Sequence, residues 1–271
     1  MLKRWRKIQQ TQGVLNAFSR SLDIVRSRLR TRIQLYSYEL SSNNNVTQTY
    51  NGRPVFFFTP TFQSYARIVH DEIEKVVIDE LVEKVTSEDV FFDIGANIGQ
   101  FSCIVGAATP VKKVVAFEPY APNIELLSKN VAINNVDGKI IECALSNTTG
   151  EGELNVLKST EPGSQEHTLS NTTYHQNLDS VNSKSIALRT GDELIAADEC
   201  PQPTTLKIDV EGAGPQVIRG LSTALSHKEC RLIIVEPHHN TEEIKSLLEE
   251  LGFVVDDVDG TGPEATLIGQ K

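Results

Sequence analysis

Four residues at two-residue steps, Asp93, Gly95, Asn97 and Gly99, stand out in the stretch VFFDIGANIGQFS (residues 90–102). The apolar run before the aspartate predicts a buried strand, and the small residues after it predict a turn into a helix. Glycines in such a turn let a ligand approach the backbone, and the free amides of a helix N-terminus can donate to it. The pattern therefore indicates a ligand-binding turn at the end of a strand.

The aspartate distinguishes this turn from a phosphate cradle. The dinucleotide fingerprint G-x-G-x-x-G lacks its third glycine here, which disfavours an NAD-dependent enzyme. A carboxylate at Asp93 would repel a pyrophosphate, whereas it suits an amine or another cation. Glu118 lies about 20 residues further on, at the end of a second predicted strand, where a carboxylate can accept both hydrogen bonds of a ribose diol. An amine-binding turn followed by a ribose-binding glutamate describes S-adenosylmethionine, whose sulfonium and amino-acid ends need no phosphate cradle.

Three charged residues alternate along a later strand, TTLKIDVEG (204–212): Lys207, Asp209 and Glu211. Their spacing predicts that all three side chains point to one face of the strand or its exit. A lysine near two carboxylates helps to keep them ionised, so Asp209 or Glu211 could act as a general base or orient an acceptor. In the alternative interpretation, Lys207 and one carboxylate form a buried ion pair that only shapes the strand end.

Two histidines follow the next strand, in EPHHN (236–240). His238 or His239 could serve as a base, or could join Asp209 as ligands of a metal ion such as magnesium. We favour the alternative that both are solvent-facing loop residues, and we predict no metal. His167 and His175, in a polar segment, are expected to take no part in the site.

The elements that would position these residues alternate between strand and helix after a helix at 71–85. Such alternation predicts an α/β fold with a doubly wound, mostly parallel sheet and helices on both faces. The two closing strands need no helix between them, so we expect an antiparallel C-terminal edge hairpin. Strands are predicted at 89–95, 112–119, 139–146, 204–212 and 230–237, a strand and a short helix within 185–198, and helices from 98 and at 121–135, 214–225 and 241–252.

The N-terminal part differs from the alternating strands and helices in its charge and in its predicted elements. We predict an extension over residues 1–69, comprising a basic helix and a β-hairpin (46–58) around Asn51-Gly52, before a main domain over 70–271. Residues 1–33 hold nine Lys and Arg against one acid, so the helix could lie on an anionic membrane surface or grip a partner. Alternatively, it packs on its own domain or pairs with a second copy in a homo-oligomer. The polar segment 158–183 is predicted to be a long mobile loop or lid.

Composition narrows the function further. The formal net charge is −10, and without residues 1–33 the chain has 17 basic and 35 acidic residues, or −18, which argues against nucleic acid as a ligand. Because the sequence has no membrane-span-length apolar run and no secretory signal, we expect a cytoplasmic protein. The cysteines lack metal-ligand spacing, which predicts buried, reduced thiols. They are Cys103, Cys143, Cys200 and Cys230.

Taken together, these motifs resemble the FkbM group of class I (Rossmann-like) S-adenosylmethionine-dependent methyltransferases. The resemblance spans roughly residues 70–258 and rests on FFDIGANIGQFS, VVAFEPYAPNIELLSKNVAINN, CALSNTTGEGEL and LKIDVEGAGPQVIRGL. It implies that Asp93 and the backbone of the glycine turn surround the methionine portion, and that Glu118 holds the ribose. It also implies three neighbouring sets of residues: Pro119 and Tyr120 beside the ribose, Ala144 and Leu145 by the adenine, and Asp209 with Glu211 and Gly212 where the methyl group passes.

The resemblance implies O-methylation of a hydroxyl on a glycan or small metabolite. The alternative is a catalytically degenerate cofactor-binding module that the basic N-terminal helix recruits to a membrane or a glycan-assembly complex. Two departures from the family pattern favour the alternative: Gly214 replaces a usual acidic residue, and Gly191 replaces a leucine.

Overall fold

The computed structural model describes residues 35, 37–39, 44–69, 74–156, 161–164, 167–169, 182–258 and 266–271. The chain divides into two compact units between Asn44 and Asn45, and the second unit contains every element below. Most of the basic helix expected over residues 1–40 lies outside the described residues, although residues 35 and 37–39 are helical, and most of the segment 158–183 also lies outside them. The hairpin that we assigned to the N-terminal extension falls in the same unit as the main sheet. None of the described helices is long and apolar enough to span a membrane.

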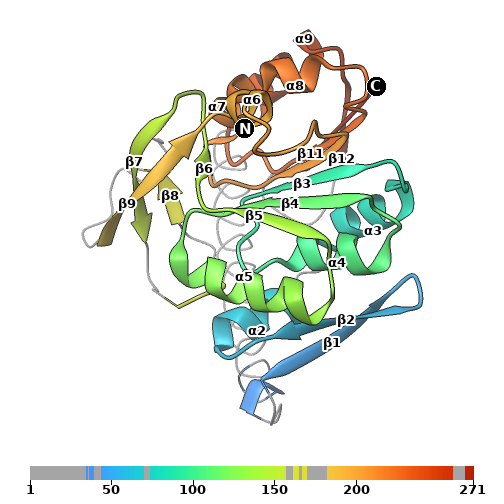
Figure 1. Ribbon diagram of the computed structural model, residues 1–271, viewed down its shortest axis with the longest axis vertical. Helices are drawn as coiled ribbons and strands as arrows, with labels where there is room; N and C mark the ends of the chain where they lie inside the picture. Colours follow the sequence, from blue (N-terminus) through green and yellow to red (C-terminus); the bar gives the residue numbers. More distant parts are fainter. Residues whose placement is uncertain are drawn as a thin grey trace, which may run out of the picture. The chain divides into compact units, whose positions relative to one another are not determined.

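A seven-stranded sheet in the order β12-β13-β11-β10-β3-β4-β5 forms the centre of the second unit (Figure 1). The strands β11, β10, β3, β4 and β5 run parallel, and β13 pairs antiparallel with β11 and β12. The predicted doubly wound, mostly parallel sheet with an antiparallel C-terminal edge is therefore confirmed. The strands are β3 (Val90–Ile94), β4 (Lys113–Phe117), β5 (Gly138–Ile141), β10 (Thr205–Ile208), β11 (Leu232–Val235), β12 (Val254–Val258) and β13 (Thr266–Gln270).

Helices cover both faces of this sheet, because alternate strand residues point to opposite sides. Phe91 belongs to the cluster with α3, α4 and α5, whereas its neighbour Phe92 packs with α6, α7, α8 and α9. Both phenylalanines are fully buried. The two apolar clusters thus fix the register of the central strand. The helices are α3 (Glu74–Lys84), α4 (Gln100–Ala108), α5 (Ala121–Ile133), α6 (Gly191–Ala196), α7 (Gly214–Gly220), α8 (Ser222–Ser226) and α9 (Thr241–Glu250).

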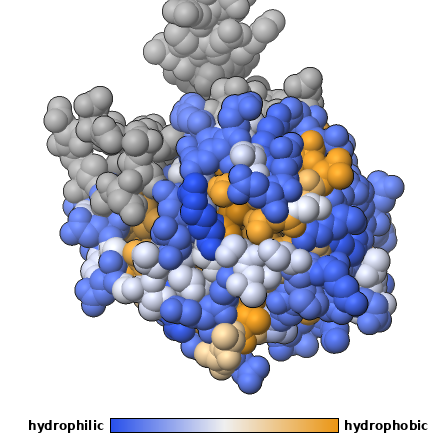
Figure 2. Space-filling view, turned by 90° about the horizontal axis from the view of Figure 1, so that it is seen from above, coloured by the Kyte–Doolittle hydropathy of each residue, from blue (hydrophilic) through white to orange (hydrophobic). Residues whose placement is uncertain are grey.

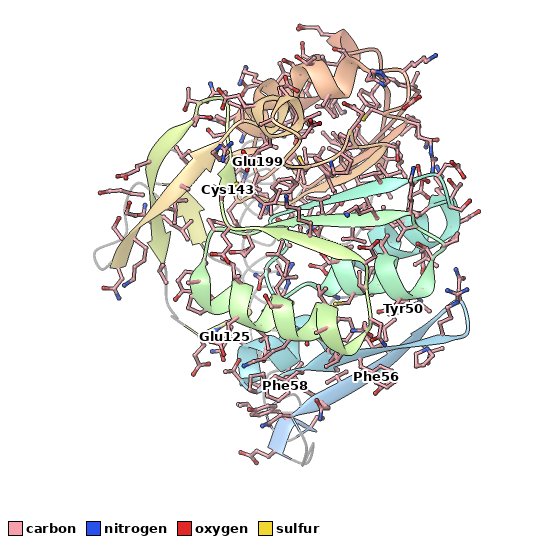
Figure 3. All side chains as sticks on the ribbon, viewed as in Figure 1. Tyr50, Phe56, Phe58, Glu125, Cys143 and Glu199 are labelled. Carbon is pink, nitrogen blue, oxygen red and sulfur yellow. The ribbon has the colours of Figure 1, made fainter. Side chains whose placement is uncertain are left out.

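The predicted hairpin is confirmed as β1 (Asn45–Tyr50) and β2 (Arg53–Phe58). Asn51 and Gly52 both have positive φ angles, 49° and 72°, as a type I′ turn requires. Strand β2, which carries Phe58, lies against α5 (Figure 3). The amide of Phe58 donates to Asn130 Oδ1 at 2.8 Å. The chain then continues into α2 (Phe62–Val69).

A second sheet, in the order β6-β9-β7-β8, was not predicted. The single strand expected at 139–146 is wrong: the chain turns after Ile141, where Cys143 N donates to Ile141 O at 3.0 Å, and the next residues pair with β9. The loop expected at 158–183 is also wrong at one place, since β8 pairs with β7. The strands are β6 (Ala144–Leu145), β7 (Gly150–Val156), β8 (His167–Leu169) and β9 (Asn182–Arg189).

The hydropathy of the surface and the burial of the cysteines both agree with what the composition indicates. Hydrophilic residues cover most of the face shown in Figure 2, and hydrophobic ones gather in a smaller area near its middle. All four cysteines are buried and free, as predicted.

Candidate functional site

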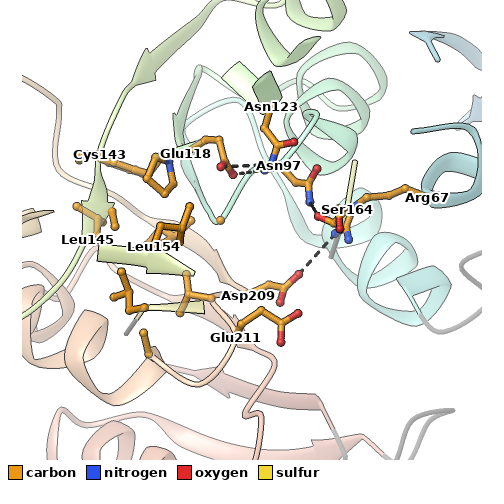
Figure 4. Close-up of a pocket in the computed structure, with 18 residues that line it drawn as sticks. Arg67, Asn97, Glu118, Asn123, Cys143, Leu145, Leu154, Ser164, Asp209 and Glu211 are labelled. Atoms are coloured by element: carbon orange, nitrogen blue, oxygen red, sulfur yellow. Dashed lines mark hydrogen bonds and ion pairs between the residues drawn. The ribbon is translucent and has the colours of Figure 1, made fainter. Parts of the chain in front are cut away.

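A cavity opens at the carboxyl ends of β3, β4 and β10 (Figure 4). Strand order reverses here, because the chain passes from β3 to β4 on one side and returns through β10 on the other. Such switch points are where open α/β sheets bind ligands. The described residues that line the cavity are Arg67, Ile94, Gly95, Asn97, Phe117, Glu118, Pro119, Asn123, Cys143, Ala144, Leu145, Leu154, Ser164, Leu169, Asp209, Val210, Glu211 and Ala213.

The turn after β3 forms one wall. Gly95 has a φ of 80°, and a Cβ atom there would lie 1.9 Å from the carbonyl oxygen of Asp209, so only glycine fits. Asn97 also has a positive φ, 50°, and its side-chain amide donates to Ser164 O at 3.0 Å. The buried Oδ1 of Asn97 has no hydrogen-bond partner within the described part of the chain. The turn therefore offers a ligand one unoccupied acceptor at the cavity wall.

Glu118 follows β4 and stands beside this turn. Its carboxylate accepts hydrogen bonds from Asn97 N at 2.8 Å, Tyr120 N at 2.9 Å and Asn123 Nδ2 at 3.3 Å. Burial raises the pKa of Glu118 to about 7, although these hydrogen bonds lower it. The carboxylate is thus held in one orientation, and the second lone pair of its Oε2 can still accept from a hydroxyl group.

The far end of the cavity is apolar. Ala144 and Leu145 of β6 meet Leu154 of β7 and Leu169 of β8 there. Leu154 and Leu169 belong to the small core under the second sheet, so the unpredicted sheet supplies this wall. An apolar slot beside polar groups suits a flat ring such as a nucleobase.

The opposite end is strongly charged. Lys207 Nζ lies 3.0 Å from Asp209 Oδ2, and a terminal nitrogen of Arg67, on α2, lies 3.5 Å from the same oxygen. Burial alone would raise the pKa of Asp209, but Lys207, a hydrogen bond with His238 and Arg67 hold it well below its usual range. Asp209 therefore stays ionised and is a weak base.

His238 connects Asp209 to Glu211. Its Nε2 lies 2.9 Å from Asp209 Oδ1 and its Nδ1 lies 3.6 Å from Glu211 Oε2. Burial alone would lower the pKa of His238, but Asp209, Glu211 and Glu236 raise it to about 9. Burial raises the pKa of Glu211 to about 7, and the charge of His238 opposes that rise. Glu211 is thus the carboxylate at this end whose pKa is suited to accepting a proton near neutrality.

Residues 93–255, more than half of the chain, match the family model described as the methyltransferase FkbM domain. The chain belongs to the FkbM methyltransferase family. It is therefore a methyltransferase, and the predicted resemblance is confirmed.

Named relatives agree with this assignment. The hexuronic acid methyltransferase AglP of Haloferax volcanii is 29% identical over 179 residues, which cover 65% of this chain and 68% of that protein. The 31-O-demethyl-FK506 methyltransferase FkbM of Streptomyces tacrolimicus is 39% identical over 62 residues, or 23% of this chain and 24% of that protein. Among solved structures, the methyltransferase FkbM from Methylobacillus flagellatus KT superposes with a TM-score of 0.47 at 16% identity, covering 69% of this chain and 44% of that chain.

Asp93, Gly99 and Lys207 lie behind the cavity instead of in its described wall. Asp93 is fully buried, and its Oδ2 accepts from the backbone amide and the hydroxyl of Ser102 on α4, at 2.9 and 2.6 Å. Gly99 lets α4 approach α5, because a Cβ atom there would lie 2.5 Å from Leu127 Cδ1. The other predicted cofactor-binding residues line the cavity: Gly95, Asn97, Glu118, Pro119, Ala144, Leu145 and Asp209.

Two site residues differ from the expectation. The interpretation that both histidines face solvent is wrong for His238, whose side chain is 17% exposed, whereas His239 is exposed. The sequence signal for the burial of His238 was its place shortly after the buried strand β11. Arg67 was missed altogether, because it comes from α2, which we had assigned to the N-terminal extension.

Ligand-type atoms of Asp209, Glu236 and His238 lie within 4.8 Å of one another, a spacing compatible with a metal ion. However, Asp209 is already paired with Lys207 and Arg67. A divalent cation at this point would face two positive charges at short range. We interpret the cluster as an ion-pair network.

Proposed function

We propose that this methyltransferase uses S-adenosylmethionine and transfers the methyl group to a hydroxyl of a glycan or small metabolite. The observation that carries the proposal is the position of Glu118, whose buried carboxylate is fixed beside the glycine turn. A ribose diol presents hydroxyl donors, and Glu118 can accept one of them at the second lone pair of Oε2.

The remaining walls fit the same cofactor. Asn97 Oδ1, to which no described residue donates a hydrogen bond, can accept from the ammonium group of the cofactor, and Gly95 leaves room for its methionine portion. Leu145 and Leu154 offer apolar surface to its adenine. S-adenosylmethionine supplies a methyl group that its sulfonium has already activated, so the chain need only orient the acceptor and remove a proton.

Glu211 is the residue to which we assign the proton. It lines the cavity, and its pKa of about 7 makes it a better base than Asp209. In the reaction the acceptor oxygen gains the methyl group, and Glu211 takes the hydroxyl proton. Asp209, held by Lys207 and Arg67, keeps a negative charge beside the transferring group.

The acceptor class rests on the relatives. One relative's name specifies a hexuronic acid and another's a 31-O-demethyl compound, which supports an oxygen acceptor for this chain. A sugar hydroxyl suits the charged end of the cavity, because Asp209 and Glu211 can accept hydrogen bonds from a polyol.

The two glycines that favoured a degenerate module have packing roles. A Cβ atom on Gly191 would lie 2.1 Å from Leu221 Cδ2, and one on Gly214 would lie 3.0 Å from Ile244 Cδ1. Both positions lie against apolar side chains away from the cavity lining. Their departure from the family pattern therefore supports no loss of catalysis.

The test is transfer of a radiolabelled methyl group from S-adenosylmethionine to a panel of acceptors that includes methyl glucuronide and other sugar glycosides. We expect Glu211→Gln to reduce kcat by roughly a hundredfold or more while cofactor affinity is kept. The matched control is Glu229→Gln, whose side chain is 62% exposed. Transfer only to nitrogen or carbon acceptors, or full activity in Glu211→Gln, would contradict the proposal.

A further inference from the structure

The loop after β11 is fastened to the loop that carries Asp209 and Glu211. The amide of Glu236 donates to Ile208 O at 2.9 Å, and Asn240 Nδ2 donates to Gly212 O at 3.0 Å. These two bonds flank His238 on both sides. The loop that carries its imidazole is therefore held against the end of β10 by bonds of the flanking residues, in addition to the contacts of the imidazole itself.

Glu211 and His238 both have a backbone conformation that residues other than glycine rarely adopt. Glu211 has a φ of 41° and His238 a φ of 44°, in the left-handed region that favours glycine. Such backbone conformations persist only where the surrounding structure enforces them, and they cluster at functional sites. Here they occur on two facing loops, at the contact between His238 Nδ1 and Glu211 Oε2.

We propose that His238 is a positioning residue for methyl transfer: its imidazole joins Asp209 to Glu211 and holds the Glu211 carboxylate ionised at the cavity wall. The inference rests on the proposed function, in which Glu211 takes the acceptor proton. His238 itself is absent from the described cavity lining, whereas Asp209 and Glu211 both belong to it. It therefore acts through its neighbours and not on the acceptor.

The charges around Glu211 explain why an imidazolium is needed. Asp209 and Glu236 face it and disfavour its ionisation, as does burial, whereas His238 and Arg67 favour it. Arg67 is already shared between Asp209, at 3.5 Å, and Glu74, at 3.0 Å. His238 is thus the cation whose ring lies beside Glu211 itself, with Nδ1 3.6 Å from Oε2.

A purely structural role would differ in one measurable respect. If the imidazole only anchored its loop through the 2.9 Å bond to Asp209, a side chain of similar reach would leave the pKa of Glu211 unchanged. If it holds Glu211 ionised, loss of its charge will raise that pKa even when the fold is intact.

The test compares His238→Gln with His239→Gln. The neighbouring histidine is a matched control, because it also has a positive φ, 73°, but is exposed. The carboxyl carbon of Glu211 is followed by NMR across a pH titration of protein labelled with ¹³C-glutamate, with the resonance assigned through Glu211→Gln. We expect the pKa of Glu211 to rise by about one pH unit or more in His238→Gln and to stay unchanged in His239→Gln.

An unchanged pKa of Glu211 in a folded His238→Gln, or an equal rise in the control, would overturn the proposal. If His238→Gln does not fold, the same coupling is read in reverse: Glu211→Gln must lower the pKa of the His238 imidazole from its value of about 9. No change there would also overturn it. Binding of S-adenosylmethionine to the wild-type chain is measured separately and tests the proposed function. The titrations need no cofactor, so failure of the His238 proposal and failure of the proposed function are distinguishable.

Discussion

The ammonium of Lys207 and the carboxylate of Asp209 form an ion pair of 3.0 Å in which the lysine side chain is 1% exposed. Lys207 also lies 4.3 Å from the centre of the Phe101 ring on α4. Through these contacts the end of β10 is tied to the helix that follows the glycine turn. The pair thus connects the two halves of the proposed site.

This pair should be expensive to break. Lys207→Met removes a fully buried cation that contacts the Asp209 carboxylate, and we expect the free energy of unfolding to fall by about 3–5 kcal/mol. Urea denaturation measures it. Arg219→Met is the control, since the Arg219–Glu243 pair is 43% and 49% exposed and should contribute less than about 1 kcal/mol. Equal effects of the two substitutions would show that the buried pair is not what stabilises the strand end.

The close approach at Gly95 gives a second prediction. Gly95→Ala places a methyl group 1.9 Å from the carbonyl oxygen of Asp209, so backbone must shift, and we expect loss of cofactor binding together with a large loss of stability. Gly52→Ala separates crowding from backbone strain, because Gly52 also has a positive φ, 72°, but no atom of the described residues beyond its chain neighbours lies within 4 Å of the added methyl. It should cost only about 1–2 kcal/mol and leave binding intact. Thermal unfolding and cofactor titration of both variants check this, and a Gly95→Ala variant that behaves like Gly52→Ala would contradict it.

We also expect no tightly bound metal at the Asp209 network. Lys207 and Arg67 already compensate Asp209, and a dication beside them would be repelled. Titration of Mn²⁺ alone, followed by electron paramagnetic resonance, should show no binding that depends on this cluster. Stoichiometric binding that Glu236→Gln abolishes would contradict the interpretation.

The central sheet was predictable because most of its strands are short, mainly apolar runs followed by charged or small residues. β3, β10 and β11 are buried along their whole length. The second sheet lacks that signal, since β7 reads GEGELNV and most of its residues are not fully buried. Its pairing depends on contacts with β9, far along the chain, which local periodicity does not reveal.

The site was predictable where a motif marks a strand end and less so elsewhere. Glu118 and Asp209 reach the cavity because parallel strands end at the same edge. Asp93 lies outside the described cavity lining, because strand alternation puts Ile94 in the lining and turns Asp93 toward Ser102. Arg67 carries no sequence signal, since only the packing of α2 brings it to Asp209.

Isothermal titration of S-adenosylmethionine tests the central claim most directly. We predict saturable binding to the wild-type chain. For Glu118→Ala we predict a loss of about tenfold to a hundredfold in affinity, because the substitution removes the carboxylate that accepts a hydrogen bond from the ribose. Glu125→Ala is the control, as its side chain on α5 is 73% exposed and away from the cavity lining. Absence of binding to the wild-type chain, or equal affinity of Glu118→Ala and wild type, would contradict the account.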